Sequence, residues 1–281
     1  GDRVHRVVKP VQLLLIAAAL ASLGACSVSH PDPPEVKEGI LDLRQWDFTQ
    51  DGPIPLKGEW LFWWEELVSP EAFLDGLIPP KSQGSFAVPG PWLHHMTPDS
   101  GGTPIGSLGY ATLTLRVLLP KPTPETRPGI GLKFANSAYQ LWAVTPTRVH
   151  PLLQNGHVSA DADAEIPDRV PQLAALPIDA EALTLVWQVS NAHHHFGGVP
   201  NSPVLDLQTD LTQKLLGKRL QSTALLGFLL IMSVYNFLLF YLRPRDSTSL
   251  WLGIATLAFC FRVVTLHQLP GLFLEPSSNT Y

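Results

Sequence analysis

Residues 181–191 have the sequence EALTLVWQVSN, in which apolar and polar side chains alternate with a period of two. One face of this stretch carries Leu183, Leu185, Trp187 and Val189, and the other carries Thr184, Gln188 and Ser190. Because successive side chains of a β-strand point to opposite faces, this pattern predicts a strand with one buried face. The stretch therefore indicates a sheet that packs its apolar face against a core.

The same alternation recurs along the middle of the chain. In YATLTLRVLLP (110–120), Ala111, Leu113, Leu115 and Val117 lie opposite Thr112, Thr114 and Arg116, and GIGLKF (129–134), AYQLWAV (138–144) and EWLFWW (59–64) behave similarly. With 27 prolines and 21 glycines to interrupt regular elements, these runs predict a mainly β fold. We expect a β-sandwich over residues 39–208. The segment SPEAFLDG (69–76) predicts one short helix, with Ser69 as N-cap and Pro70 at its first position.

The first 26 residues predict an export signal. Three basic residues precede an apolar stretch from Val11 to Ala21, which is followed by small residues. The end of this segment, LGAC (23–26), resembles the lipobox of bacterial lipoproteins, in which the cysteine is acylated. We therefore expect Cys26 to be a lipidation site, with a plain signal peptide as the alternative. Residues 27–38 are proline-rich and predict an extended linker.

The C-terminal third of the chain predicts a helical hairpin in a membrane. Residues 220–242 carry no charge and are long enough to span a bilayer. A second apolar run covers residues 247–266, and 267–281 is expected to form an extracytoplasmic loop at which the chain is truncated. Before the first span, residues 209–219 form a juxtamembrane segment. Leu207, Leu211 and Leu215 recur every four residues there, so this segment is expected to continue the first helix outward.

The basic turn between the spans, RPRD (243–246), favours the cytoplasm under the positive-inside rule. Three basic residues at the other end of the first span, Lys214, Lys218 and Arg219, weaken that argument. The export signal favours the same orientation. We therefore predict a bacterial inner-membrane protein whose β-domain is extracytoplasmic and which contacts the lipid bilayer.

Composition and motifs exclude several function classes. The chain has a net charge of −5 and lacks a basic stripe with interleaved aromatics, so nucleic acid is not an expected partner. Its two cysteines, Cys26 and Cys260, exclude a disulfide framework and a CxxC site. Walker and dinucleotide-binding glycine patterns are absent from the sequence, and Glu65 and Glu66 are adjacent and point apart. We expect no cofactor and no enzymatic activity on this segment.

Two aromatic residues are the first candidates for ligand binding. Trp92 follows VPGP and Tyr110 follows GSLG, so both lie at junctions between a loop and a strand. Exposed aromatic rings can stack on the apolar faces of sugars. We therefore interpret Trp92 and Tyr110 as candidate ligand contacts, with burial in the core as the alternative.

The stretch NAHHHFGG (191–198) holds the remaining candidates, Asn191, His193 and His195. If the strand continued, His193 and His195 would share a face, which is compatible with a two-histidine metal site. A third ligand would have to come from His94, His95, His157 or Asp206, so no metal site is assigned. Ligand binding and pH sensing stay open. The alternative is that the strand ends at Asn191 and the histidines lie in a loop without a binding role.

The order of these features resembles a known family. ILDLRQWDFTQDGPIPLKGEWLFWWEELVSPEAF, VPGPW, GSLGYATLTLRV, LVWQVSN and LRPRDSTSLWLGI follow one another between Gly39 and Tyr281. This order resembles the bacterial seven-transmembrane receptors with diverse intracellular signalling modules. The resemblance implies a periplasmic, galactose-binding-like jelly-roll sensor domain, seven helices, and a cytoplasmic signalling module in cis such as a diguanylate cyclase or a histidine kinase.

From this resemblance we predict the sensor portion of a signal-transduction receptor that binds a small ligand, for which a carbohydrate is the favoured class. A homodimer is left open. LKGEW, VPGPW and GYATLTLRV also resemble the noncatalytic jelly roll of some glycoside hydrolases, which is a shared fold and not a shared function. The alternatives are such a hydrolase domain, or a membrane-anchored carbohydrate-binding or assembly module without signalling.

Overall fold

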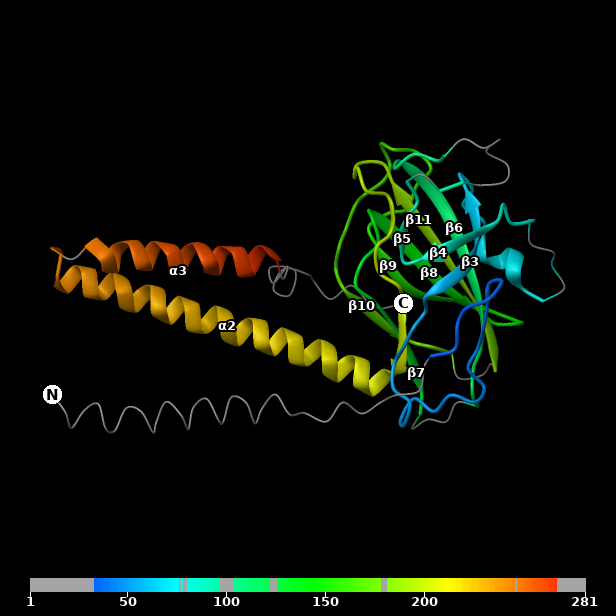
Figure 1. The fold of residues 1–281 in the computed structure, drawn as a ribbon, viewed down its shortest axis with the longest axis horizontal. Coiled ribbons are helices and arrows are strands. Elements are labelled where there is room, and N and C mark those ends of the chain that lie inside the picture. The colour runs from blue at the N-terminus through cyan, green and yellow to red at the C-terminus, as the bar shows by residue number, and fades with distance from the viewer. Residues whose placement is uncertain are drawn as a thin grey trace, which may run out of the picture. The chain divides into compact units, whose positions relative to one another are not determined.

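The structure is a computed structural model that describes residues 33–75, 77, 80–93, 95–96, 104–121, 126–177, 181–245 and 247–266. The predicted export signal with Cys26, His94, and the predicted loop at 267–281 lie outside the described residues. Thirteen strands are found in the described part of the chain (Figure 1): β1 Ile40–Asp42, β2 Ile54–Pro55, β3 Gly58–Trp64, β4 Ser85–Val88, β5 Gly90–Pro91, β6 Gly109–Leu118, β7 Pro128–Leu132, β8 Ala138–Val144, β9 Val149–Asn155, β10 Gln172–Ala175, β11 Ala182–Asn191, β12 Gly198–Val199 and β13 Val204–Leu207.

The strands form a β-sandwich. The larger sheet has the order β4-β3-β6-β11-β8-β9, with β1 added parallel to β6, and the smaller sheet has the order β10-β7-β13-β2. β5 and β12 pair separately. One core cluster joins both sheets, with Leu113, Leu185 and Trp187 from the larger sheet and Ile130 and Leu205 from the smaller. The predicted mainly β sandwich is therefore confirmed.

The strand predicted over residues 181–191 lies at the centre of the larger sheet. β11 pairs antiparallel with β6 on one side and with β8 on the other, and Leu185 is opposite Leu115 in the register with β6. The four apolar residues predicted to share a face are all buried: Leu183, Leu185, Trp187 and Val189. Trp187 contacts Trp60 of β3 edge-on, with ring centroids 5.6 Å apart.

Part of the opposite face of the larger sheet, at Thr112 and Gln188, is covered by the chain after β3. Thr112 of β6 is fully buried, and its hydroxyl donates to the carbonyl of Glu66 and accepts the N–H of Val68. Gln188 of β11 donates to the carbonyl of Val68. The predicted helix at 69–76 is a single 3-10 turn, η1 Pro70–Phe73, with Ser69 as N-cap and its hydroxyl bonded to the Glu71 carboxylate. This segment therefore buries polar groups that the alternation alone would expose.

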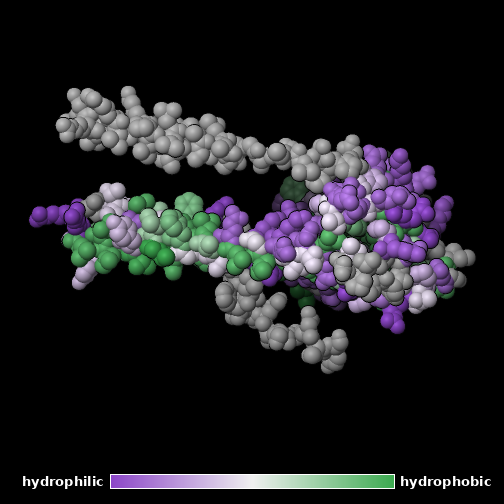
Figure 2. All heavy atoms as spheres, turned by 90° about the horizontal axis from the view of Figure 1, so that it is seen from below, coloured by the Kyte–Doolittle hydropathy of each residue, from purple (hydrophilic) through white to green (hydrophobic). Residues whose placement is uncertain are grey.

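Two helices follow the sandwich, α2 Gln208–Leu242 and α3 Ser247–Leu266. Both are long and apolar enough to cross a membrane, over Gln208–Leu242 and Ser247–Val264. Figure 2 shows that their surface is largely hydrophobic, whereas the surface of the sandwich is mainly hydrophilic. The helices pack closely at Gly253, whose carbonyl accepts the hydroxyl of Ser233 at 3.0 Å. Since α2 begins at Gln208, residues 209–219 continue the first apolar helix, as the leucine spacing predicts.

Candidate functional site

The three histidines lie in a loop. β11 ends at Asn191 and β12 begins at Gly198, so His193, His194 and His195 fall between the two strands. His193 and His195 are exposed. The loop interpretation is therefore correct, and the strand that would have given His193 and His195 a common face is not formed. Within the described residues, no group of three or more histidine, cysteine, aspartate or glutamate side chains could hold a metal ion.

Asn191 fixes the start of this loop. Its side-chain amide donates to the carbonyls of Ser107 and His194, and its side-chain oxygen accepts the N–H of His194 at 3.0 Å. The residue is only 1% exposed. Asn191, predicted as a ligand contact, therefore uses its polar atoms to hold the loop.

The tip of the loop is an aromatic stack. The rings of His194 and His195 lie nearly parallel with centroids 5.0 Å apart, and His195 contacts Phe196 at 4.6 Å. The N–H of Phe196 donates to Nδ1 of His194. Phe196 is 57% exposed, so this loop presents a large apolar ring to solvent.

Trp92 does not lie on the surface. It is 1% exposed, its indole N–H donates to the carbonyl of Ser107 at 2.7 Å, and its ring contacts Trp64 edge-on. The expectation of an exposed aromatic is wrong here because the histidine loop folds over the ring. Gly197 makes this possible, since a Cβ at that position would lie 2.0 Å from the indole nitrogen of Trp92 and 1.9 Å from the carbonyl oxygen of Ser107.

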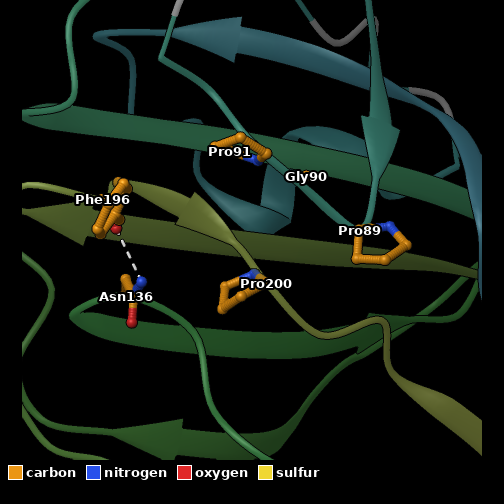
Figure 3. Close-up of a pocket in the computed structure, with 7 residues that line it drawn as sticks. Pro89, Gly90, Pro91, Asn136, Phe196 and Pro200 are labelled. Carbon is orange, nitrogen blue, oxygen red and sulfur yellow. Dashed lines mark hydrogen bonds between the residues drawn. The ribbon is translucent and has the colours of Figure 1, made fainter.

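A small cavity opens beside the loop. It has a volume of about 270 Å³, just below the range of about 300–1,000 Å³ that is typical of ligand pockets. Three segments that are distant in sequence line it (Figure 3): Pro89, Gly90, Pro91, Asn136, Phe196, Gly197 and Pro200. None of the predicted site residues is part of this lining. Tyr110 is half-buried, and its carbonyl accepts the N–H of Glu65.

Asn136 supplies the polar side chain of the cavity wall. It is 6% exposed, and its side-chain amide donates to the carbonyl of Phe196 at 2.7 Å, as Figure 3 shows. Its side-chain oxygen accepts a hydrogen bond from the guanidinium of Arg169. The Asn136 N–H donates to Gly198. Sequence reasoning missed Asn136 and Phe196 as residues of the cavity wall.

A buried carboxylate supports the wall behind Asn136. Glu165 is 5% exposed; it accepts the hydroxyl of Ser137 and, at 3.0 Å, the N–H of Ala192 at the start of the histidine loop. Tyr139 lies nearby in β8. Burial, together with the negative charge of Asp168, raises the pKa of the Tyr139 hydroxyl well above its ordinary value. Glu165 therefore connects two of the segments around the cavity.

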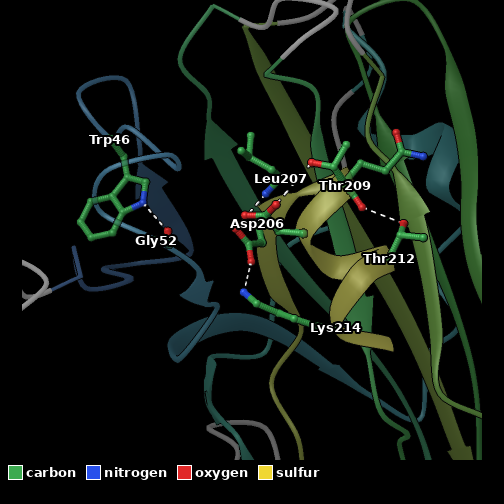
Figure 4. A network of polar contacts seen from close by, with 9 residues as sticks. Trp46, Gly52, Asp206, Leu207, Thr209, Thr212 and Lys214 are labelled. Atoms are coloured by element: carbon green, nitrogen blue, oxygen red, sulfur yellow. Dashed lines mark hydrogen bonds and ion pairs between the residues drawn. The ribbon is translucent and has the colours of Figure 1, made fainter. Parts of the chain in front are cut away.

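The junction between sandwich and helix is the second feature of functional interest. β13 runs directly into α2, and Asp206 of β13 forms an ion pair with Lys214 of α2, with Oδ2 and Nζ 2.6 Å apart (Figure 4). The N–H of Gln208 donates to the carbonyl of Arg127 at the edge of β7. Gly129 of β7 lies under the start of α2, where a Cβ would come within 3.0 Å of the Cα of Gln208. The first turns of α2 are therefore attached to the smaller sheet.

Residues 218–281 match the family model described as 7TM diverse intracellular signalling. The predicted resemblance to these receptors is confirmed for this part of the chain. The family is one of receptor domains, and with two apolar helices it indicates a membrane protein. No curated protein sequence matches the chain.

Solved structures resemble the sandwich only distantly. A β-glucuronidase from Faecalibacterium prausnitzii is 14% identical with a TM-score of 0.39, covering 54% of this chain and 31% of the enzyme. A Ruminococcus gnavus β-glucuronidase is 13% identical with a TM-score of 0.37, over 54% and 28% of the two chains. A GH2 β-galacturonidase from Eisenbergiella tayi is 13% identical with a TM-score of 0.33, over 54% and 24%. The matched region spans less than a third of each enzyme, and these scores carry no argument about function.

Proposed function

We propose that this chain is the sensor portion of a bacterial membrane signal-transduction receptor. In this proposal the β-sandwich is extracytoplasmic, binds a small ligand of the carbohydrate class in the cavity beside the histidine loop (residues 192–197), and passes a conformational bias to the helices. A cytoplasmic signalling module in cis would receive that bias. The export signal over residues 1–26 and a lipid on Cys26 belong to the same proposal, which places the protein in the inner membrane.

The observation that carries this proposal is the direct continuity of β13 and α2. A ligand shifts a conformational equilibrium only by its different affinity for the two states. If a flexible tether joined the sensor domain to the membrane helices, a conformational change in the domain would not be transmitted to the helices. Here the strand continues into the helix at Leu207–Gln208, and the buried Asp206 carboxylate holds Lys214, almost two turns into α2.

Two of the segments that line the cavity are continuous along the chain with the strands that contact α2. The lining includes Asn136, which follows β7 in sequence, and Pro200, which precedes β13. β7 and β13 pair antiparallel, with Leu205 opposite Ile130. A ligand that changes the spacing of the cavity walls therefore acts on segments that are continuous with the strands under α2.

Binding and coupling can be tested on the full chain in lipid nanodiscs. A panel of monosaccharides is screened by thermal shift, and hydrogen exchange is then measured at residues 204–215 with and without a sugar that binds. We expect Phe196→Ala to weaken binding because Phe196 is the exposed ring of the cavity wall. Ile40→Ala, which also truncates an exposed apolar side chain (47%), is the matched control because Ile40 is not among the lining residues.

The two readouts separate the proposed receptor from its alternatives. A sugar that binds and changes exchange at residues 204–215 supports a sensor. A sugar that binds and leaves this segment unchanged supports a carbohydrate-binding module without signalling. If none of the sugars raises the melting temperature, the carbohydrate part of the proposal is wrong.

A further inference from the structure

The ring of His194 is bonded to Phe196, a residue of the cavity wall. Its Nδ1 lies 3.1 Å from the main-chain nitrogen of Phe196 and 3.2 Å from the carbonyl oxygen of the same residue. Phe196 lines the cavity, and its carbonyl also accepts the side-chain amide of Asn136 at 2.7 Å. The position of this part of the wall therefore depends on a contact with an imidazole.

The contact with the Phe196 N–H fixes the protonation state of His194. A main-chain N–H can only donate, so Nδ1 carries no proton and accepts it. Imidazole is the side chain whose charge ordinarily changes between pH 5 and 8. When Nδ1 gains a proton it becomes a donor toward the Phe196 carbonyl, which already accepts Asn136. Protonation therefore leaves the Phe196 N–H without its acceptor.

The main chain on both sides of Phe196 is held in place. The side chain of Asn191 bonds the N–H and the carbonyl of His194. On the other side, Gly197 packs so closely on Trp92 that a Cβ would lie 2.0 Å from the indole nitrogen. Phe196 itself is 57% exposed. A change at the His194 ring is therefore passed to Phe196, because its neighbours have little room to move.

The charged and titratable groups around His194 do not hold a proton on its ring. In the same loop, His193 is exposed, and His195 stacks on the ring with centroids 5.0 Å apart, so like-charge repulsion disfavours a charge on both rings. Between β9 and β10, Glu165 bonds the main chain at the start of the loop and Arg169 bonds the cavity wall. Among the described residues, none forms an ion pair with His194. The charge of this ring therefore follows the pH of the surrounding solution.

We propose that His194 is a proton-sensitive switch in the cavity wall. The neutral ring holds the main chain of Phe196 and completes the wall. The protonated ring releases the Phe196 N–H, so the wall loosens in acid. The switch uses only residues of the wall and the loop, and it operates whichever small molecule the cavity binds. It therefore adds a response to pH to the proposed sensor.

Hydrogen exchange on the full chain in lipid nanodiscs measures the switch at the Phe196 amide. Exchange is followed at about pH 7.5 and about pH 5, and each rate is divided by that of an unstructured peptide of the same sequence, which removes the direct effect of pH. We expect the protection of this amide to fall about fivefold in acid, as the loss of one hydrogen bond implies. The amides of Leu113 and Leu115 in β6 should keep their protection.

Nitrogen-15 NMR of the same sample, labelled in its histidine rings, reads the protonation state directly. The His194 ring is assigned through its contact with Phe196. At about pH 7.5 we expect a neutral ring with its proton on Nε2 and none on Nδ1, because Nδ1 accepts the Phe196 N–H. This measurement uses the unmodified chain, so it tests the switch even where a variant is unstable.

Three substitutions of the same kind test the residue. In His194→Asn the side-chain oxygen can take the place of Nδ1 and accept the N–H without titrating, so protection should be retained in acid. His193→Asn is the matched control, because the exposed His193 ring makes no hydrogen bond or ring contact with a described residue. His195→Asn removes the stacked ring and keeps the acceptor. Both of these variants should keep the response to acid, and the melting temperature of each variant establishes that it is folded.

The switch is wrong if the Phe196 amide is equally protected at both pH values, if Nδ1 carries the proton at neutral pH, or if β6 loses protection as much as the loop. It is also wrong if His194→Asn responds to acid like the unmodified chain. A response that persists in His194→Asn and disappears in His95→Gln assigns the effect to His95 instead. Each of these outcomes leaves the receptor proposal standing, because that proposal is tested by ligand binding and by exchange at residues 204–215.

Discussion

Asp206 and Lys214 form an ion pair across the point at which strand becomes helix. The carboxylate is 1% exposed, while the lysine side chain is 54% exposed and reaches back along α2 to meet it at 2.6 Å. Apart from this ion pair, the carboxylate accepts the N–H of Leu207 at 2.9 Å. A buried charge of this kind is stable only while its partner is present.

Lys214→Met should therefore destabilise the protein more than loss of an exposed lysine usually does. The substitution retains the aliphatic stem and leaves a buried carboxylate without its cation, at an expected cost of about 1–3 kcal/mol. Thermal unfolding of the full chain followed by circular dichroism measures this cost.

The double variant Asp206→Asn/Lys214→Met provides the internal check. It removes the uncompensated charge, so it should be more stable than Lys214→Met alone. Lys218→Met is the control one turn further along α2, where the lysine is exposed and forms no ion pair with a described residue. Equal effects of Lys214→Met and Lys218→Met would show that the ion pair contributes nothing.

Gly129→Ala should disturb the same junction by a different route. The added Cβ would lie 3.0 Å from the Cα of Gln208 and 3.2 Å from the carbonyl oxygen of Ala174, so main-chain atoms would have to move. We expect a loss of about 1–3 kcal/mol and altered hydrogen exchange at the start of α2. Gly131→Ala is the matched variant two residues along β7, where the new Cβ makes ordinary contacts at 3.7 Å or more with Leu211 and Gln172. If both variants behave alike, α2 does not pack closely on β7.

Gly197→Ala should open the histidine loop. Its Cβ would overlap the indole nitrogen of Trp92 and the carbonyl oxygen of Ser107. The hydrogen bond between these two groups supports the loop. We expect a loss of about 2 kcal/mol or more, a change in tryptophan fluorescence, and loss of the ligand binding that we propose for the cavity. Gly106→Ala, one residue before Ser107, meets no atom within 4 Å and should leave all three unchanged. A stable Gly197→Ala protein with unchanged fluorescence would contradict the described loop.

The alternation in β6 and β11 was sufficient to predict a sandwich, because period-two burial is a local property of a strand. The alternation was not sufficient to predict which residues on the other face of the sheet are buried. Thr112 and Thr114, which alternation puts on a polar face, are buried. For Thr112 the cover is the segment after β3, 44 to 46 residues away in sequence, which supplies its hydrogen-bond partners. Which segment covers a sheet depends on tertiary packing, and a single sequence does not encode it locally.

The site was harder to predict than the fold for the same reason. Asn136 meets Phe196 over 60 residues of sequence and Arg169 over 33. Each lies in a connecting segment whose position is set by which strands pair, and not by its own pattern. The burial of Trp92 was not predicted, because the local sequence around a tryptophan at a loop–strand junction is the same whether or not a distant loop covers the ring. The helix after β13 was predictable because the spacing of Leu207, Leu211 and Leu215 is local.

His95 should make the stability of the sandwich sensitive to acid. Its ring packs edge-on against Phe62 and Phe86, with centroids 5.4 and 5.1 Å away. Burial lowers the pKa of His95 below its ordinary value of 6.5, and a hydrogen bond with the main chain of Ser85 opposes this in part. The unfolded chain therefore binds the proton more readily than the folded chain. The stabilisation from a neutral ring is complete above pH 6.5 and is lost as the pH falls through the lower, folded-state pKa.

His95→Gln should consequently reduce the fall in melting temperature between about pH 7.5 and about pH 5, even if it lowers the melting temperature itself. The measurement is thermal unfolding of the full chain across this range. His193→Gln is the matched control, because His193 is exposed in the histidine loop, and its replacement should preserve the pH dependence of the unmodified protein. If His95→Gln and the unmodified chain lose stability equally on acidification, protonation of this ring is not coupled to folding, and other groups account for the sensitivity.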